Sequence, residues 1–340
     1  MWLGTLFTSA AASFGRLLLV GLLPNAILVA YVWLLLALHA FTNRGQDAPL
    51  TLMDLGQVNF RTDAGGLLLF VLLVVLLTAV VQPFQVRVVR IVEGYWRREN
   101  WLYRFAVGAH QRRSDRLRQQ AISGIDLRDN ELLSKPADEQ IAEQRRARRL
   151  SAAASRAKGK LKSYPPPDAD VLPTMLGNVL RRGERIAGER YALDTISSWP
   201  RLYPYVGDKV ATEFDSETDG VDASVNLALV FIVMSVLGFV AFANDRWMLI
   251  VPVLLVLLAL AAYRAAISSA RQLGLTMVVA YDLYRFDLIR GLHLELPVTP
   301  EAEAERNRVI TRFFKSSDDR LAPPEATVSL HGLTYRHPAD

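Results

Sequence analysis

Residues 223–263 read ASVNLALVFIVMSVLGFVAFANDRWMLIVPVLLVLLALAAY, and this stretch decides the fold of the chain. It contains two segments without Asp, Glu, Lys or Arg, at 223–244 and 247–263. A helix of about 20 such residues crosses a hydrocarbon core of roughly 30 Å. The turn Asn244-Asp245-Arg246 joins the two segments, and it is too short for anything but an antiparallel hairpin. The stretch therefore predicts two membrane-spanning helices.

Two further charge-free segments, at 17–43 and 64–86, lie nearer the N-terminus. Buried helices of soluble proteins seldom contain charge-free runs longer than about 14 residues. We therefore expect an all-α membrane protein with four transmembrane helices and a largely helical cytoplasmic domain. The four transmembrane helices are predicted at 17–41, 65–84, 225–243 and 247–263.

The first 14 residues contain no basic residue, and the apolar run that follows is longer than the roughly 7–15 residues of a signal peptide. We therefore expect the first span to be a retained anchor. Apolar residues at helical spacing within 1–14 predict a short helix on the membrane surface ahead of it.

The distribution of Arg and Lys predicts the orientation. Arg44 and Arg61 are the only basic residues between the first two spans, whereas residues 82–224 carry 25. Since basic residues concentrate on the cytoplasmic side, we expect both termini and a middle domain at 85–224 to be cytoplasmic, with an outer loop at 42–64. The 33 Arg against 6 Lys suggest a GC-rich bacterial genome, and hence a multi-pass protein of a bacterial inner membrane.

The composition excludes several classes of site. The chain is 51% hydrophobic, yet its mean hydropathy is only +0.18, because apolar and charged residues lie in separate blocks. It contains no cysteine, which excludes disulfides, zinc fingers, iron–sulfur clusters and thiol catalysis. No phosphate-binding loop, nucleophile elbow or zinc-protease motif occurs. We predict no catalytic, cofactor or metal site, and we read the net charge of +5 as a sign of membrane orientation rather than of nucleic-acid binding.

A basic, amphipathic segment follows the second span. Apolar residues keep near-helical spacing from 88 to 109, with arginines between them. This pattern predicts a helix that leaves the bilayer obliquely, with its arginines reaching anionic headgroups; a solvated helix face is the alternative. The predicted headgroup contacts are Arg87, Arg90, Trp96, Arg97, Arg98 and Trp101.

The remaining polar sequence divides into four parts. Residues 120–167 are highly charged and end in three prolines, which predicts an exposed helical hairpin and a linker. The stretch 199–205, WPRLYPY, predicts either a packed corner, with Arg201 stacked on Trp199 or Tyr203, or a rim that recognises a planar or anionic partner. A helical extension at 265–315 is expected to pack on the middle domain, and 316–340 is expected to be a flexible tail. The candidate partner-binding or packing residues are Asn178, Arg181, Trp199, Arg201 and Tyr203.

Small residues form two ridges at four-residue spacing at the end of the fourth span. Such ridges let helices approach closely, so we expect this helix to continue unbroken into the cytoplasm and to pack tightly there. The two ridges comprise Ala261, Ala265 and Ser269, and Ala262, Ala266 and Ala270.

Several short motifs resemble those of a group of bacterial four-span membrane proteins. They are QPFQ at 82–85, EGYW at 93–96, PT and LGN at 173–174 and 176–178, YALD at 191–194, WPRL at 199–202 and DLYRFD at 282–287. The likeness runs from the first span to about residue 315. It implies the four-span topology and no particular activity.

We therefore expect an integral membrane protein that acts by self-assembly or by binding a cytoplasmic protein. An oligomeric channel or pore-forming effector is the alternative, with Thr78, Asn226 or Ser235 lining the pore. A membrane-bound lipid-processing enzyme is a second alternative, for which Glu93 and Glu99 are the candidate carboxylates.

Overall fold

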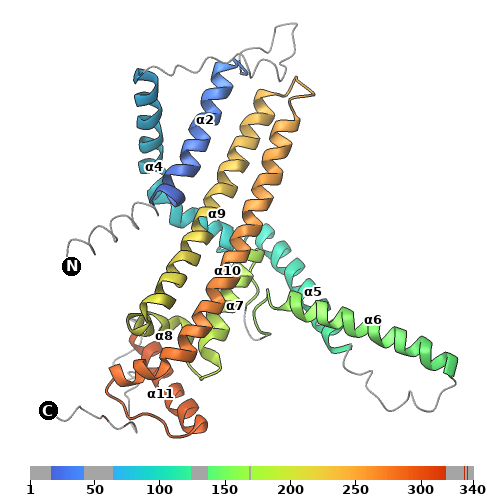
Figure 1. Ribbon diagram of the computed structural model, residues 1–340, viewed down its shortest axis with the longest axis vertical. Helices are drawn as coiled ribbons and strands as arrows, with labels where there is room; N and C mark the ends of the chain where they lie inside the picture. The colour runs from blue at the N-terminus through green and yellow to red at the C-terminus, as the bar shows by residue number, and fades with distance from the viewer. Residues whose placement is uncertain are drawn as a thin grey trace. The chain divides into compact units, whose positions relative to one another are not determined.

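The computed structural model describes residues 17–41, 64–123, 137–167, 170–318, 333 and 335. The predicted surface helix at 1–14 and most of the outer loop and tail lie outside these residues. The described part is helical, without a named strand, and its elements are η1 (Leu17–Leu22), α2 (Leu23–Ala37), α4 (Ala64–Glu93), α5 (Trp101–Ser123), α6 (Ala137–Leu161), α7 (Met175–Glu189), α8 (Thr195–Leu202), η3 (Tyr203–Tyr205), α9 (Asp208–Ala241), α10 (Ile250–Gly291) and α11 (Pro300–Asp318) (Figure 1).

Four helices are long and apolar enough to cross a membrane: the one containing Val20–Ala37, then α4, α9 and α10. The prediction of an all-α chain with four such helices is confirmed. Helix α10 has 42 residues, or about 63 Å at 1.5 Å per residue, against a hydrocarbon core of roughly 30 Å. It therefore continues far beyond a bilayer without a break.

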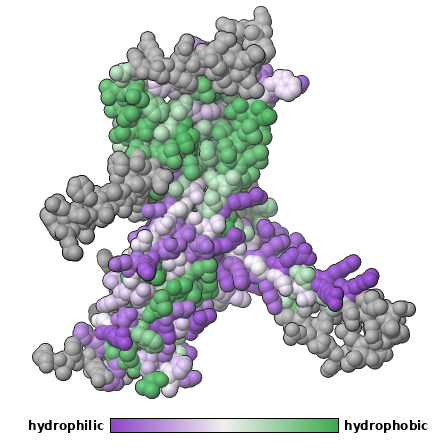
Figure 2. Space-filling model, viewed as in Figure 1, coloured by the Kyte–Doolittle hydropathy of each residue, from purple (hydrophilic) through white to green (hydrophobic). Residues whose placement is uncertain are grey.

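The chain divides into two compact units. The membrane unit comprises residues 1–92 and 216–269, and the polar unit comprises 93–215 and 270–340. Figure 2 shows the apolar surface of the membrane unit over α2, α4 and the adjoining parts of α9 and α10.

In the membrane unit, α2 packs on the α9–α10 hairpin. Tyr31 and Leu35 of α2 form a core with Met234 of α9 and Leu255 of α10. Helix α4 is attached more sparsely, since Val74 is its one buried residue.

Polar side chains within this unit form hydrogen bonds within and between its helices. Asn25 Nδ2 donates to Thr78 Oγ1 at 3.0 Å, and Thr78 Oγ1 donates to Val74 O at 2.7 Å. Asn226 Nδ2 donates to Val20 O at 3.0 Å, and Ser235 Oγ donates to Pro252 O at 2.9 Å. Each of these donors thereby gives a carbonyl or hydroxyl oxygen a hydrogen-bond partner in a region where no water is available.

In the polar unit, α8, α10 and α11 surround one apolar core that includes Leu202, Tyr281, Leu288 and Phe314. Helices α5 and α6 lie side by side as a hairpin (Figure 1), and Leu117 and Ala157 join them near its base. The hairpin is longer than the sequence suggests, because its first helix begins at Trp101.

The expectation of one continuous helix after the second span is wrong. Helix α4 ends at Glu93, and Gly94 adopts φ +97°, a left-handed conformation that suits glycine. Helix α5 starts at Trp101, seven residues after Gly94 (Figure 1).

Candidate functional site

The end of α4 is seated on the start of α7. Thr174 Oγ1 donates to Glu93 O at 2.8 Å and accepts a bond from Gly177 N at 3.1 Å, which caps α7. A Cβ on Gly177 would lie 1.8 Å from Glu93 O, and a Cβ on Gly94 would lie 2.8 Å from the Pro173 ring. The EGYW and PT-LGN motifs, about 80 residues apart in the chain, therefore form one junction.

Asn178 holds the loop before α7. Its side chain is fully buried, its Oδ1 accepts a bond from Leu172 N at 2.8 Å, and its Nδ2 donates to Leu172 O and Thr174 O at 2.8 and 2.7 Å. Of the two roles expected for this residue, partner binding or packing, the contacts of Asn178 match packing within the fold. Arg181 is half-buried, with its Nε 4.0 Å from Glu184 Oε2.

The WPRLYPY stretch forms a packed corner. The Trp199 ring lies 5.6 Å from Tyr203, 4.8 Å from Phe214 and 6.0 Å from Tyr281 between centroids. Tyr203 Oη donates to Asp215 Oδ1 at 2.7 Å, and burial and this carboxylate together raise the pKa of Tyr203 to about 12. These contacts anchor the corner to α9 and α10.

Arg201 stacks over the ring of Phe314, 4.4 Å from its centroid. This partner comes from α11 and differs from the Trp199 or Tyr203 that the local sequence suggests. Its distance in sequence, more than 100 residues, explains why spacing does not predict it.

A buried ion pair links α10 to α11. Arg285 Nε lies 2.7 Å from Glu303 Oε1, and the two side chains are 16% and 10% exposed. The Arg285 guanidinium also stacks on the ring of Tyr191 at 4.1 Å, and Tyr191 Oη donates to Asp282 Oδ1 at 2.6 Å. The DLYRFD and YALD motifs thus meet in one cluster. The spacing of the first suggests an Asp282–Arg285 pair, whereas Glu303, which sequence reasoning missed, is the carboxylate against Arg285.

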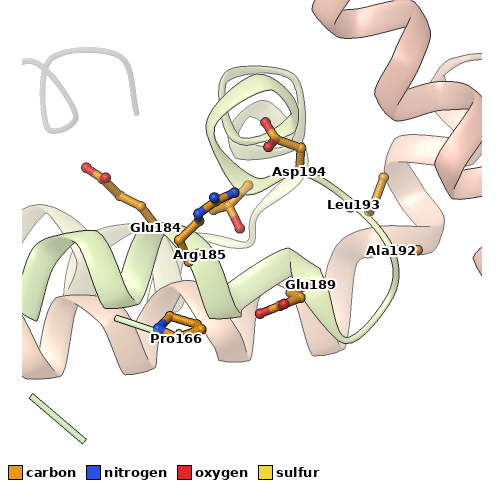
Figure 3. Close-up of a pocket in the computed structure, with 8 residues that line it drawn as sticks. Pro166, Glu184, Arg185, Glu189, Ala192, Leu193 and Asp194 are labelled. Carbon is orange, nitrogen blue, oxygen red and sulfur yellow. The ribbon is translucent and has the colours of Figure 1, made fainter. Parts of the chain in front are cut away.

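A cavity of about 170 Å³ is lined by Glu184, Arg185 and Glu189 of α7 and by Asp194, the residue that caps the start of α8 (Figure 3). Burial raises the pKa of Glu184, although Arg181 opposes the shift. Burial also acts to raise the pKa of Asp194, but hydrogen bonds from Lys315 and Ser197 outweigh it and hold that pKa below its ordinary value. Among the described residues, no group of His, Asp or Glu could hold a metal ion.

The predicted headgroup residues are mostly at the surface. Arg87, Arg90, Arg97, Arg98 and Trp101 are exposed, and Trp96 is half-buried. Large apolar side chains near them, among them Tyr95, Leu102 and Phe105, are also exposed.

The two small-residue ridges of α10 differ in burial. Ala266 and Ala270 are buried and Ala262 is half-buried, whereas Ala261 and Ala265 are exposed. Half-buried Ser269 faces Gly220 of α9, where an added Cβ would lie 2.8 Å from Ser269 Oγ. In the polar unit, Gly274 of α10 meets Gly183 of α7 so closely that a Cβ on Gly183 would lie 2.9 Å from Gly274 Cα.

Beyond the ridges, α10 carries an exposed apolar stripe. Leu275, Val279 and Leu283 recur every four residues and are 58%, 44% and 58% exposed. We call these three residues the α10 stripe. They face away from the core of the polar unit, and the sequence alone does not mark them, since apolar residues here are as readily core.

Comparisons of the chain with protein-family models, with curated proteins and with solved structures gave no match.

Proposed function

We propose that the protein is an integral membrane protein that assembles with copies of itself through the α10 stripe. The observation that carries this proposal is the exposure of Leu275, Val279 and Leu283 outside any stretch that lipid tails could cover. The charge-free part of α10 ends before Arg264, and Leu275 follows 11 residues later, about 16 Å along the helix. Burying such a side chain contributes roughly 1.5–3 kcal/mol. A contiguous apolar surface in water favours a protein contact.

A second copy fits this stripe better than an unrelated protein does. All copies inserted in one membrane share one topology, so the stripes of two copies stand at the same height. A two-fold contact then pairs the stripe with itself. The exposed Ala261 and Ala265 support the same arrangement, because small residues let membrane helices approach closely.

Two other functions have less support. The polar side chains proposed to line a pore, Thr78, Asn226 and Ser235, all donate to backbone carbonyls within the membrane unit. The carboxylate of Glu99 forms a surface ion pair with Arg97 at 3.7 Å, an arrangement without the paired acids of a hydrolase. We place the assembly in a bacterial inner membrane with the polar unit and both termini cytoplasmic, as the basic residues indicate.

Single cysteines test this proposal cleanly, because the chain has none. Val279→Cys in native membranes should form a disulfide-linked dimer on oxidation, whereas Arg149→Cys, exposed on α6, should stay monomeric. Adding Leu275→Ser and Leu283→Ser should abolish the Val279→Cys dimer without changing the unfolding temperature. A Val279→Cys chain that stays monomeric, or that links to a protein of another mass, would overturn self-assembly.

A further inference from the structure

The chain directly after α4 presents bulky apolar side chains to solvent. Tyr95, Trp101, Leu102 and Phe105 are 51%, 68%, 45% and 66% exposed. Between them lie the exposed arginines Arg97, Arg98 and Arg104. We call residues 95–105 the interfacial segment. Segments that combine aromatic rings with neighbouring arginines typically lie at a bilayer surface.

Helix α5 is apolar on two opposite sides at its start. One side runs from the half-buried Tyr103 to the buried Ser114 and Leu117, and Leu117 packs in one core cluster with Ala157 of α6. Trp101 and Phe105 lie about 200° around the helix from Tyr103, at 100° per residue. A helix that served the hairpin alone would carry polar residues on that outer side. The second apolar side therefore requires a second apolar environment.

The position of the segment limits what that environment is. Helix α4 loses its charge-free character at Arg87 and ends at Glu93, two residues before Tyr95. The turn at Gly94 is fixed by the ring of Pro173 and by the bond from Thr174 to Glu93 O. Trp101 is only eight residues past the end of α4, so the segment stays within reach of the headgroup layer.

The charges of the segment select the lipid. Its acidic neighbours are Glu99, 3.7 Å from Arg97, and Asp170, 3.4 Å from Arg98, and all four side chains are exposed. Such exposed pairs are weak and exchange with solvent, so these guanidinium groups remain available to phosphates, which bind them in a bidentate manner.

We infer that the interfacial segment is a binding surface for anionic phospholipid, with Trp101 and Phe105 seated in the headgroup layer and Arg97, Arg98 and Arg104 on lipid phosphates. This inference is independent of self-assembly, since it uses different residues and a different partner.

Charge selectivity is tested with the full chain in mild detergent and fluorescent phosphatidylglycerol or phosphatidylcholine as the probe. The chain should prefer phosphatidylglycerol. The triple variant R97Q/R98Q/R104Q should lose about fivefold in affinity per arginine, or about a hundredfold in all. The matched control R145Q/R146Q/R149Q removes the same charge from exposed positions of α6 and should change affinity less than twofold. Equal losses in the two triple variants, or no lipid preference in the parent chain, would overturn the inference.

Insertion is tested separately in nanodiscs of phosphatidylglycerol and phosphatidylcholine. A fluorophore on Phe105→Cys should be quenched by brominated lipid and shielded from iodide, and one on Arg149→Cys should show the reverse. If the Phe105→Cys probe is shielded from both quenchers, protein covers the segment and the lipid assignment is wrong. If iodide quenches it, the segment faces water and the assignment is equally wrong. The failure of either lipid test leaves the Val279→Cys dimer unaffected, so the two proposals fail independently.

Discussion

Replacing Gly177 with alanine probes the seating of α4 on α7. The added Cβ would lie 1.8 Å from Glu93 O and 2.9 Å from Glu93 C, where ordinary contacts begin at 3.4 Å. Glu93 O and Glu93 C belong to the backbone and cannot rotate away. The two helices must therefore separate by about 1.6 Å, the difference between 3.4 and 1.8 Å. Such overpacking costs about 1–3 kcal/mol. The separation also breaks the 2.8 Å bond from Thr174 Oγ1 to Glu93 O, which costs about 1–3 kcal/mol if the carbonyl stays unsatisfied.

Alanine regains about 1 kcal/mol through its higher helix propensity. The net loss is then about 1–5 kcal/mol, which lowers the unfolding temperature by about 2–20 °C at roughly 2–4 °C per kcal/mol. Thermal unfolding of the full chain in one detergent, followed by tryptophan fluorescence, measures this difference.

The matched control is Gly159→Ala in α6, where an added Cβ meets nothing within 4 Å. It changes helix propensity alone, so its unfolding temperature should equal or slightly exceed that of the parent chain. If Gly177→Ala unfolds at the same temperature as Gly159→Ala, then the close contact between α4 and α7 is not present in the protein.

Two further changes test the polar unit. Arg285→Met leaves Glu303 as an unpaired buried carboxylate and should destabilise the folded chain by about 3–5 kcal/mol. The double variant R285M/E303L should recover most of this loss. Equal unfolding temperatures of the single variant and the parent would contradict a buried pair. Asp194 has a pKa below its ordinary 3.8, so its contribution to stability is fully present above 3.8 and is lost as pH falls through the lower folded-state value. The unfolding temperature of the parent should therefore exceed that of Asp194→Asn near neutral pH, and the difference should shrink in strong acid; a difference that does not change with pH would show that Asp194 stabilises by shape alone.

The four apolar helices could be predicted because their signal is local. A charge-free run of about 20 residues has few other uses, whatever the rest of the chain does. The helix break at Gly94 could not be predicted in the same way. Its cause is the contact with Pro173 and the seat for Glu93 O at Gly177, both about 80 residues away in sequence. A single glycine within a helical pattern does not reveal such a contact.

The side-chain partners in the polar unit likewise include pairs that local sequence predicts and pairs that it does not. The pair Asp287–Arg290, at 2.9 Å, follows from helical spacing, because residues three apart share a face. The same rule fails for Arg285, since Glu303 offers a buried carboxylate from another helix. The ring of Phe314 beneath Arg201 is likewise a tertiary contact. Local spacing identifies residues that can pair, and the fold selects among them.

The buried residues of the motifs restrict where a partner can bind. Asn178 is fully buried, and both polar atoms of its amide form hydrogen bonds with its own loop. The space next to Gly177 is occupied by the backbone of Glu93, and Arg285 forms an ion pair with Glu303. These groups determine the geometry of the polar unit through contacts within it. Free energy remains to be gained where large apolar side chains stay in contact with water, at roughly 25 cal/mol per Å² buried. In the described part of the polar unit the α10 stripe and the interfacial segment are two places where several such side chains are exposed together. The stripe lies on a helix that extends beyond the bilayer, and the segment directly follows α4. The first therefore favours protein and the second favours lipid.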